Sequence, residues 1–521
     1  MSEGLLLSLM GVMLFSAILT GVPVSFVLFG VPTLIALLGA VTGTFDLAFL
    51  DAFPSRTFGL LTNPVFISVP LFVLMGGLLE KSDIARRMML TAGALFGERR
   101  GGMAYAVIIV GALLAASTGV IGATIFMLGL IALPAMLSAN YSPRLASGVI
   151  CSSGSLGQII PPSILLILLA DQVSAAYQAG RRMAGEFAVE PVSVGDLFAG
   201  ALLPGLLLVV FYIGYVFIVS LIRPDDCPPV RNMEAAGISS RPDASEVIRA
   251  LVFPIALILL VLGSILGGVA TPTESAALGA AGALVMVAMD AGGSRMRRWR
   301  RWALMAVLPA AFLLVIVKLL GGANASAVLM MLGIVAFAIF LFGLSLAGWQ
   351  ETRDGKLPQA AQETASMVSM LVLIVLGATL LSVVFRGLGG DEIVTDFLQN
   401  LPGGKATALL AVMAVVFFLG FIIEYVEIIF IVIPVAGPPL MAAGIDPVWF
   451  AILISMNLQM SFLTPPFGYA LFYFRSVAPA SLLTREIYIS IIPFIFIQML
   501  ALGLVAAFPA IATWLPGVIY N

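Results

Sequence analysis

The sequence SSGSLGQIIPPS at residues 152–163 has a partner, NLQMSFLTPPFG at residues 457–468, and together the two stretches decide the fold. In each, small polar residues precede two consecutive prolines inside an otherwise apolar segment. Consecutive prolines remove two backbone donors and free carbonyl groups one turn earlier, so each stretch predicts an interrupted helix. Because lipid cannot pair the freed groups, both breaks should be buried in protein or line a cavity.

The two stretches belong to a longer internal repeat. Residues 117–171 align without gaps with residues 421–475, at an offset of 304 positions. The coinciding prolines are Pro134 with Pro438, Pro143 with Pro447, Pro161 with Pro465, and Pro162 with Pro466. Each copy ends in a span with a mid-helix proline, Pro204 or Pro493. Matching interruptions in two halves indicate a transport site at the bilayer midplane. An odd number of expected spans per half predicts that the second copy is inverted.

Composition predicts a membrane protein. The chain has 521 residues, of which 61% are hydrophobic and 10% charged, whereas about a quarter of the residues of a soluble protein are charged. At roughly 20 residues per span, there is room for about a dozen transmembrane helices. We therefore expect an all-α polytopic membrane protein of about twelve spans, with two further hairpins and an inverted repeat.

The chain can be divided by its apolar segments. The expected spans are 5–21, 23–43, 64–80, 144–171, 195–222, 247–269, 272–290, 303–320, 325–348, 361–387, 446–475 and 485–513. Two broken stretches, 101–138 and 403–441, are expected hairpins, each either re-entrant or a pair of full crossings. Two stretches that mix charged and apolar residues, 82–98 and 388–400, should lie along the membrane surface. The sizeable polar segments are 172–194, 223–246 and 349–360.

These segments predict an organisation in five parts. We expect scaffold helices over 1–63, a first inverted repeat over 64–222 with hairpin 101–138 and broken helix 144–171, scaffold helices over 223–290, an additional helix pair over 291–360, and a second inverted repeat over 361–521 with hairpin 403–441 and broken helix 446–475.

The basic residues predict the orientation. Of the 25 Lys and Arg residues, 19 fall on one side of the expected membrane and Lys318 lies in a span; the other side holds Arg56, Arg181, Arg182, Arg386 and Lys405. Because cytoplasmic loops concentrate Lys and Arg, both termini should face the periplasm.

The basic run RMRRWRR at 295–301 is interpreted as an anchor on anionic lipid, and no nucleic-acid partner is expected.

Several function classes are excluded by what the sequence lacks. It contains no histidine, which removes His-based catalysis, Ser-His-Asp triads and nearly every zinc site. Cys151 and Cys227 have no metal or redox spacing. No selectivity motif repeats as it would in a channel. We therefore expect neither an enzyme nor a bound cofactor.

The apolar stretch Gly4 to Val22 is interpreted as a retained first helix rather than a signal peptide.

Candidate ion- and substrate-binding residues lie at the breaks and in the hairpins. They are Ser117, Thr118, Gly119, Gly154, Ser155, Leu156, Gly157, Gln158, Pro161, Pro162, Ser163, Glu424, Glu427, Asn457, Gln459, Ser461, Thr464, Pro465 and Pro466. Freed carbonyls with hydroxyl and amide oxygens suit a hard monovalent cation, and half-helix N-termini suit a carboxylate. For each hydroxyl the alternative is repair of the broken hydrogen-bond ladder.

Two carboxylates and one short motif have more than one interpretation. Glu424 and Glu427 lie in the second hairpin, where a carboxylate is costly and functional by default. Ion binding, proton coupling and a scaffold contact all fit, as does a purely structural pair. The motif from Thr271 to Glu274 places Thr, Pro and Glu at the spacing of a helix capping box, which we favour over a transport role.

These residues resemble the large membrane subunit of tripartite ATP-independent periplasmic (TRAP) transporters. The matching stretches are PLFVLMGGLLEKS at 70–82, GALLAASTGVIGAT at 111–124, CSSGSLGQIIPPSI at 151–164, LFAGALLPGLLL at 197–208, GGVATPTESAALGA at 267–280 and GIDPVWFAILISMNLQMSFLTPPFGYALF at 444–472. The resemblance implies an elevator fold, Na⁺ as the coupling ion, a periplasmic substrate-binding protein and a small four-helix membrane subunit, in a bacterial inner membrane.

The resemblance also implies site residues. In that family the hairpin tips and broken helices hold sodium ions and substrate, and the matching positions are Ser117 to Gly119, Gly154 to Gln158, Glu424, and Gln459 to Pro466. Na⁺ is expected at backbone or side-chain oxygens of Ser117, Gly119, Ser155, Gly157, Gln459 and Thr464. The tip at Ser117 departs from the Ser-Gly-Ser-Ser pattern of shorter members.

The additional pair 303–348 resembles the longer branch of the family, which is associated with keto and hydroxy acids and related compounds. Small organic acids of the keto, hydroxy or dicarboxylate type are therefore the expected substrates. The alternative is a stand-alone anion carrier or cation/proton antiporter with a similar inverted architecture, which would need no binding protein.

Overall fold

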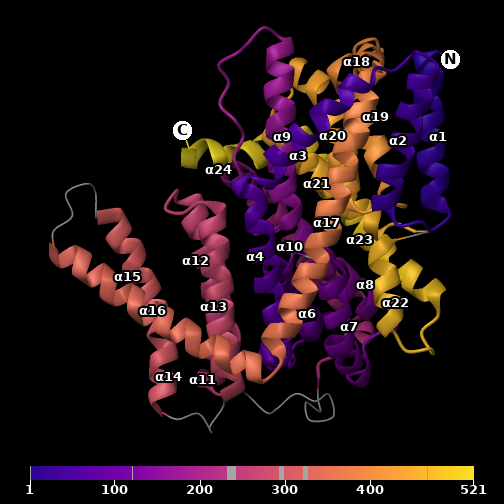
Figure 1. The fold of residues 1–521 in the computed structure, drawn as a ribbon. Coiled ribbons are helices and arrows are strands. Elements are labelled where there is room, and N and C mark those ends of the chain that lie inside the picture. Colours follow the sequence, from indigo (N-terminus) through magenta and orange to yellow (C-terminus); the bar gives the residue numbers. More distant parts are fainter. Residues whose placement is uncertain are drawn as a thin grey trace.

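The computed structural model describes residues 2–119, 121–230, 242–292, 298–320, 327–465 and 468–520. These residues form helices and connecting turns without any β-strand, which confirms the expected all-α class (Figure 1). Nine of the described helices are long and apolar enough to cross a membrane. The full number of crossings stays a prediction.

The helix bounds follow the chain order. The first 63 residues contain α1 (Glu3–Leu19), α2 (Val24–Val41) and α3 (Ala52–Leu61). The next segment contains α4 (Pro64–Glu80), α5 (Ile84–Phe96), α6 (Gly102–Thr118), α7 (Ile121–Ser138), α8 (Pro143–Ser155), α9 (Ile164–Met183) and α10 (Val194–Ile222). It is followed by α11 (Ala244–Val247), α12 (Phe253–Leu266), α13 (Pro272–Gly292), α14 (Arg298–Met305), α15 (Val307–Leu320) and α16 (Ala327–Arg353). The last part contains α17 (Lys356–Gly387), α18 (Gly390–Gln399), α19 (Lys405–Leu419), α20 (Tyr425–Ala442), α21 (Pro447–Leu463), α22 (Tyr469–Val477), α23 (Thr484–Ala507) and α24 (Ala510–Tyr520).

Two expected segment boundaries are wrong. Helix α9 continues to Met183, so much of the polar segment 172–194 is helical. In this part of α9, Val173, Ala176 and neighbouring residues are buried. Gly180 packs against the backbone of α20. The last expected span, 485–513, is two helices, because Pro509 excludes the preceding residue from helical geometry.

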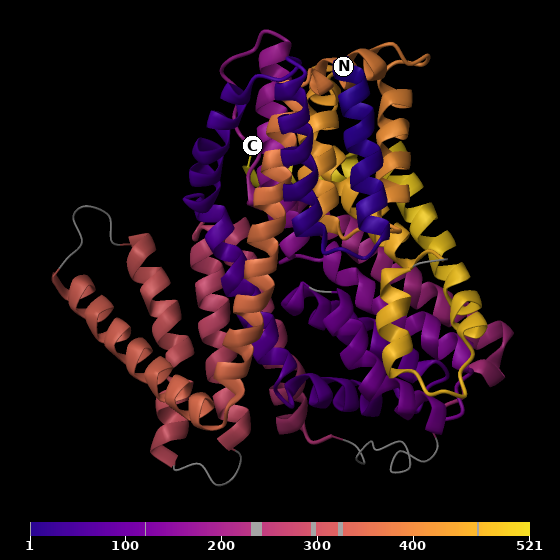
Figure 2. The same ribbon diagram turned by 45° about the vertical axis from the view of Figure 1, so that its right-hand side comes forward.

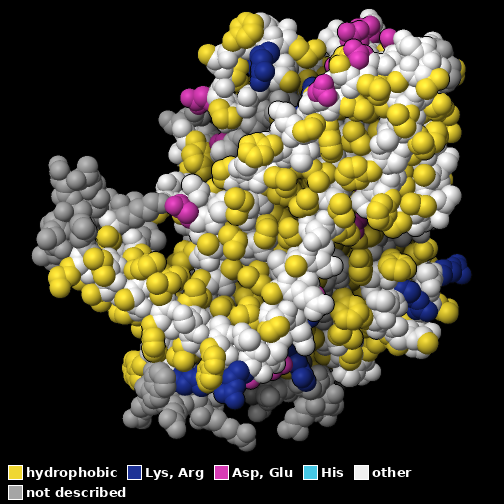
Figure 3. Space-filling view, in the orientation of Figure 1, with side chains coloured by type: hydrophobic (Ala, Val, Ile, Leu, Met, Phe, Trp, Pro, Cys, Tyr) yellow, Lys and Arg dark blue, Asp and Glu magenta, His cyan; other side chains and the backbone are white. Residues whose placement is uncertain are grey.

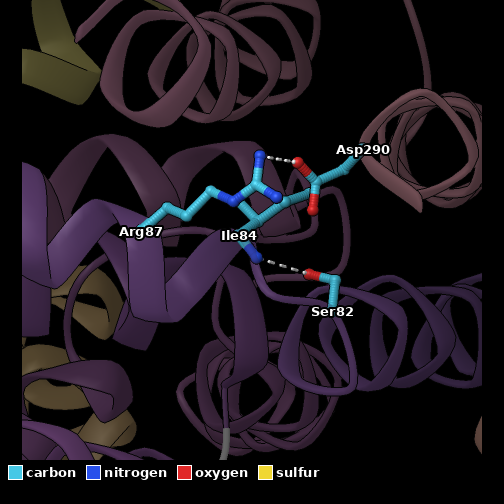
Figure 4. Close-up of polar contacts among 4 residues, drawn as sticks. All are labelled: Ser82, Ile84, Arg87 and Asp290. Atoms are coloured by element: carbon cyan, nitrogen blue, oxygen red, sulfur yellow. Dashed lines mark hydrogen bonds and ion pairs between the residues drawn. The ribbon is translucent and has the colours of Figure 1, made fainter. Parts of the chain in front are cut away.

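The two stretches expected to lie along the membrane surface are helices α5 and α18, at opposite ends of the molecule, and their position relative to a membrane stays a prediction (Figures 1 and 2). Helix α5 is attached to the end of α13 by an ion pair between Arg87 Nη1 and Asp290 Oδ1, 2.5 Å apart (Figure 4). Just before α5, the hydroxyl of Ser82 accepts a hydrogen bond from the backbone N–H of Ile84 at 3.3 Å. These contacts fix the start of α5 against the helix bundle.

The motif at the start of α13 is a helix cap, as the sequence predicted. The backbone N–H of Thr271 donates to Glu274 Oε2 at 2.9 Å, and the N–H of Glu274 donates to Thr271 Oγ1 at 3.3 Å. This reciprocal pair is a capping box. The neighbouring hydroxyl of Thr273 donates to the Pro64 carbonyl at 2.7 Å, which joins the starts of α13 and α4.

The additional pair α15 and α16 projects away from the main helix bundle (Figures 1 and 2). It meets the remainder through a small apolar cluster separate from the main core, formed by Val285, Ala288, Leu304, Val307 and Ala347. The main core lies among the other helices. Figure 3 shows apolar side chains covering the middle of one face, with Lys and Arg mainly in its lower half.

Candidate functional site

Helix α23 shows that the two repeat copies run in opposite directions. At the start of α8, Arg144 lies 4.0 Å from Glu486, near the beginning of α23. At the start of α21, the indole N–H of Trp449 donates to the Val505 carbonyl at 2.8 Å, near the end of α23. These two points are about 28 Å apart at the α-helical rise. The equivalent helices α8 and α21 therefore begin at opposite ends of α23, which is the geometry of an inverted repeat.

The two helix breaks meet between those ends. Gln459 Nε2 on α21 donates to Ser155 Oγ at the end of α8, at 3.3 Å, and both side chains are fully buried. Gln498 of α23 also directs its Nε2 at Ser155 Oγ, 3.5 Å away, and donates to the hydroxyl of Tyr212 on α10 at 2.8 Å. Because Gln498 lies between Glu486 and Val505 on α23, this network lies in the interior of the bundle.

The network leaves buried amide oxygens without hydrogen-bond donors. Gln459 Oε1 and Gln498 Oε1 have no hydrogen-bond partner among the described residues, and neither does either side-chain polar atom of Gln158. An unpaired buried amide oxygen costs roughly 1–3 kcal/mol. A cation with several oxygen ligands is one occupant that would satisfy such acceptors, and the ion site itself stays a prediction.

The predicted hydroxyl groups donate to carbonyls of their own broken helices. Ser155 donates to the Ser152 carbonyl at 2.8 Å and Ser163 to the Gln158 carbonyl at 2.7 Å. In the second copy, Ser461 donates to Leu458 at 3.0 Å and Thr464 to Met460 at 2.7 Å. These bonds repair the interrupted ladders. The hydroxyl oxygens of Ser163, Ser461 and Thr464 keep lone pairs, so repair and ion ligation are compatible there, whereas Ser155 Oγ already accepts from Gln459 and Gln498.

The first hairpin turns beside the first break. Gly119 ends α6 at φ 62°, and a Cβ there would lie 3.1 Å from Ile164 Cγ1, at the start of α9. A Cβ on Gly157 would lie 3.0 Å from the Cβ of Ala115 on α6. Glycine is therefore needed for the close approach of the break to the hairpin. Ser117 and Thr118 end α6, while their side chains lie outside the described residues.

The second hairpin turns beside the second break. Gly420 ends α19 directly against Ser461 Oγ, leaving no room for a Cβ. Asn457 Nδ2 donates to the Met413 carbonyl of α19 at 2.6 Å, which uses the amide nitrogen to join helix and hairpin. Because each hairpin reverses at the level of a break, the geometry supports re-entrant hairpins over pairs of full crossings.

Glu424 lies at the tip of the second hairpin and contacts the segment that follows the second break. It precedes α20, and its Oε1 accepts a hydrogen bond from the hydroxyl of Tyr469 on α22. Tyr469 in turn lies 3.0 Å from the hydroxyl of Tyr473. The ring of Tyr473 packs where a Cβ of Gly122 would be, on α7 of the first hairpin. This chain of contacts links the two hairpins.

Glu427 is placed differently from Glu424. Its side chain is 3% exposed, and its Oε2 has no hydrogen-bond partner among the described residues. Among the described residues no hydrogen bond between the two carboxylates supports the alternative of a purely structural pair, and Glu424 is bound by Tyr469 instead.

The remaining predicted residues surround the first break or lie in the second. Gly154 packs against Ile125, and Leu156, Pro161 and Pro162 are buried. Pro465 is half-buried after α21, and Pro466 lies outside the described residues.

Sequence reasoning missed four residues of the network, namely Tyr212, Gln498, Tyr469 and Tyr473. Tyr212 and Gln498 are isolated polar residues inside long apolar spans, and that pattern in the sequence could have identified them as candidates. The two tyrosines follow the second break at helical spacing, but only their contacts distinguish them from ordinary membrane aromatics.

The chain matches a known family along nearly its whole length. The model of the tripartite ATP-independent periplasmic transporter, DctM component, matches residues 11–348 and 308–511. The C4-dicarboxylate TRAP transporter large permease protein DctM of Rhodobacter capsulatus is 26% identical over 507 residues, covering 97% of this chain and 98% of the relative. The sialic acid TRAP transporter large permease protein SiaM of Vibrio cholerae is 24% identical, with 95% of each chain covered.

A solved structure shares the fold. The YdaH transporter of Alcanivorax borkumensis superimposes with a TM-score of 0.53 at 14% identity, covering 90% of this chain and 91% of that one. At this identity the likeness concerns the fold alone, and it places the helices described above in a membrane-transporter architecture. The extent of the family match, together with the paired breaks and hairpins, shows that the chain belongs to the DctM family, the large permease component of TRAP transporters.

Proposed function

We propose that this chain is the permease of a sodium-coupled importer of small organic acids of the keto, hydroxy or dicarboxylate type. A periplasmic binding protein delivers the substrate, and a small four-helix membrane subunit completes the complex in the bacterial inner membrane. The observation that carries the proposal is the contact between Ser155 and Gln459, because it brings two oppositely oriented helix breaks together in the bundle interior.

The coupling ion binds at this junction in the proposed mechanism. Carbonyls at the breaks, the hydroxyl oxygens of Ser155 and Thr464, and the amide oxygen of Gln459 are neutral ligands suited to Na⁺. Among the described residues no three His, Cys, Asp or Glu side chains form a metal-binding group. A site of neutral oxygen ligands favours a monovalent over a divalent cation. It also binds the ion weakly enough to release it in every transport cycle.

Substrate binding uses the half-helices beside the same junction. Helix α9 begins at Ile164 and α22 at Tyr469, each just after a break, so their N-termini carry partial positive charge close to the junction. A carboxylate is stabilised by such termini. Both curated relatives described above are named for carboxylic acids, which supports an organic acid as the cargo.

The proposed movement is an elevator step. Hairpins and broken helices contact one another through Gly119, Gly157 and Gly420, so they can move as one unit against helices such as α17. Both termini face the periplasm in this proposal. The gathering of Lys and Arg toward one end of the face in Figure 3 supports the cytoplasmic assignment of that end.

The test is uptake into proteoliposomes that contain the permease and its small subunit. Labelled succinate, pyruvate and lactate are offered with an inward Na⁺ gradient, with and without the proposed periplasmic binding protein. We expect uptake that needs both Na⁺ and the binding protein. Uptake without the binding protein, or driven by a proton gradient alone, would instead identify a stand-alone carrier.

A further inference from the structure

A cavity of about 460 Å³ lies between α3, α9, α17 and α20, away from the junction of the breaks. Three arginines line it, Arg56 on α3, Arg182 on α9 and Arg386 on α17. All three belong to the five basic residues that the sequence places on the less basic, periplasmic side. The preference of Lys and Arg for cytoplasmic loops therefore does not explain these three arginines. Their position around one cavity suggests a role in binding.

The positive charge of the cavity is only partly balanced by the protein. Within the described ranges none of these three arginines forms a salt bridge, and Arg386 Nη2 donates only to the Pro434 carbonyl, at 3.3 Å. The charge of Arg386 acts repulsively on Arg56. Arg56 and Arg182 are exposed and Arg386 is half-buried, so water screens part of this repulsion, and an anion bound among the three arginines would relieve more of it.

The one carboxylate that lines the cavity is bonded to amides instead. Asp171 Oδ1 accepts from Asn63 Nδ2 at 2.6 Å, and its Oδ2 accepts from Gln172 Nε2 at 2.9 Å. Asp171 therefore offsets one of three positive charges and leaves an excess of guanidinium donors. Guanidinium groups bind planar oxyanions through paired hydrogen bonds, and the volume is that of a small-molecule pocket.

The cavity also lies along the helices that start at the candidate site. Asp171 is about 10 Å from the start of α9, and Arg182 is close to its other end. On α20, which begins beside Glu424, the cavity is lined by Phe430, Pro434 and Pro438. An anion held here lies between the outer end of the bundle and the junction of the breaks.

We propose that Arg56, Arg182 and Arg386 form an oxyanion-binding site, for a carboxylate or a phosphate, that precedes the central site on the periplasmic side. Its position on the path of an organic acid rests on the proposed function; its anion binding does not. The site is composite, since Arg182 comes from α9 of the first repeat, Arg56 from α3, and Arg386 from α17, which packs against α3 and α20.

The experiment measures ligand-induced thermal stabilisation of the purified permease with its small subunit. Succinate and inorganic phosphate are titrated in detergent, and nanodiscs of phosphatidylglycerol are compared with nanodiscs of phosphatidylcholine. Arg56→Gln and Arg386→Gln should each weaken binding about tenfold or more, because each removes a charged donor. Lys405→Gln, which removes an exposed periplasmic-side charge outside the cavity, should leave it unchanged.

The outcomes separate the possible ligands and the two proposals. Saturation by succinate or phosphate that depends on both arginines identifies a soluble oxyanion, whereas stabilisation only by phosphatidylglycerol identifies a lipid headgroup. Equal affinities in wild type, Arg56→Gln and Arg386→Gln, or no stabilisation by any of these ligands, would overturn the site. Glu424→Gln should reduce uptake about tenfold while retaining anion binding, so failure of the transport proposal is read from the uptake assay alone.

Discussion

Ser155 and Gln459 are joined by a hydrogen bond of 3.3 Å and are separated by 304 positions, the offset of the internal repeat. Each is therefore the repeat equivalent of the other. A residue touches its own equivalent only where the pseudo-two-fold axis passes between them. This contact locates the axis at the helix breaks, where backbone groups of both copies are exposed to the same small volume.

A double-mutant cycle tests the importance of that contact. Ser155→Ala and Gln459→Leu should each lower sodium-driven uptake about tenfold, with the double variant little worse than either, since both remove one shared interaction. Uptake at a series of Na⁺ concentrations measures the effect. Ser8→Ala, which removes an exposed helical hydroxyl, is the matched control. Fully additive losses would contradict a shared site.

Glu424→Gln should reduce sodium-driven uptake about tenfold while expression stays intact, because the amide keeps the shape but not the charge at the hairpin tip. Tyr469→Phe, which removes the hydrogen bond to this carboxylate, should change uptake in the same direction but less. Transport at wild-type rates in Glu424→Gln would remove Glu424 from the site.

Thr464→Ala should raise the Na⁺ concentration needed for half-maximal uptake about tenfold, and Thr464→Ser should restore it because the hydroxyl oxygen returns. Repair of the helix end alone would lower the melting temperature without changing the sodium dependence. Measuring both quantities in both variants separates ligation from repair.

Gly420→Ala should lower the melting temperature and slow uptake, since the added methyl group meets Ser461 Oγ. Gly503→Ala is the control, because nothing lies within 4 Å of that position. It should be neutral or slightly stabilising, by up to about 1 kcal/mol. Similar effects of both substitutions would refute the close approach of hairpin and break.

Single-cysteine labelling tests the orientation. Cys151 and Cys227 are both buried, and burial raises the pKa of the Cys227 thiol, so neither native thiol should react readily with a membrane-impermeant maleimide. In intact cells with a permeable outer membrane, Glu392→Cys on α18 should be labelled. Arg485→Cys should react only after the inner membrane is opened. The reverse pattern would invert the proposed topology.

The sequence by itself determined the membrane class, the repeat and the positions of its interruptions. These features are local or periodic: apolar length predicts helices, consecutive prolines stop them, and the offset of 304 aligns the two copies. The capping box from Thr271 to Glu274 was predictable for the same reason, since all its bonds lie within one helical turn.

Only the tertiary structure decided which residues meet. Tyr212 and Gln498 join Ser155 because α10 and α23 pack beside the breaks, and Tyr469 reaches Glu424 because α22 begins beside the tip of the second hairpin. The convergence of Arg56, Arg182 and Arg386 on one cavity likewise depends on helix packing. Such neighbours are set by the crossing of helices distant in the chain, and no spacing along the sequence encodes them.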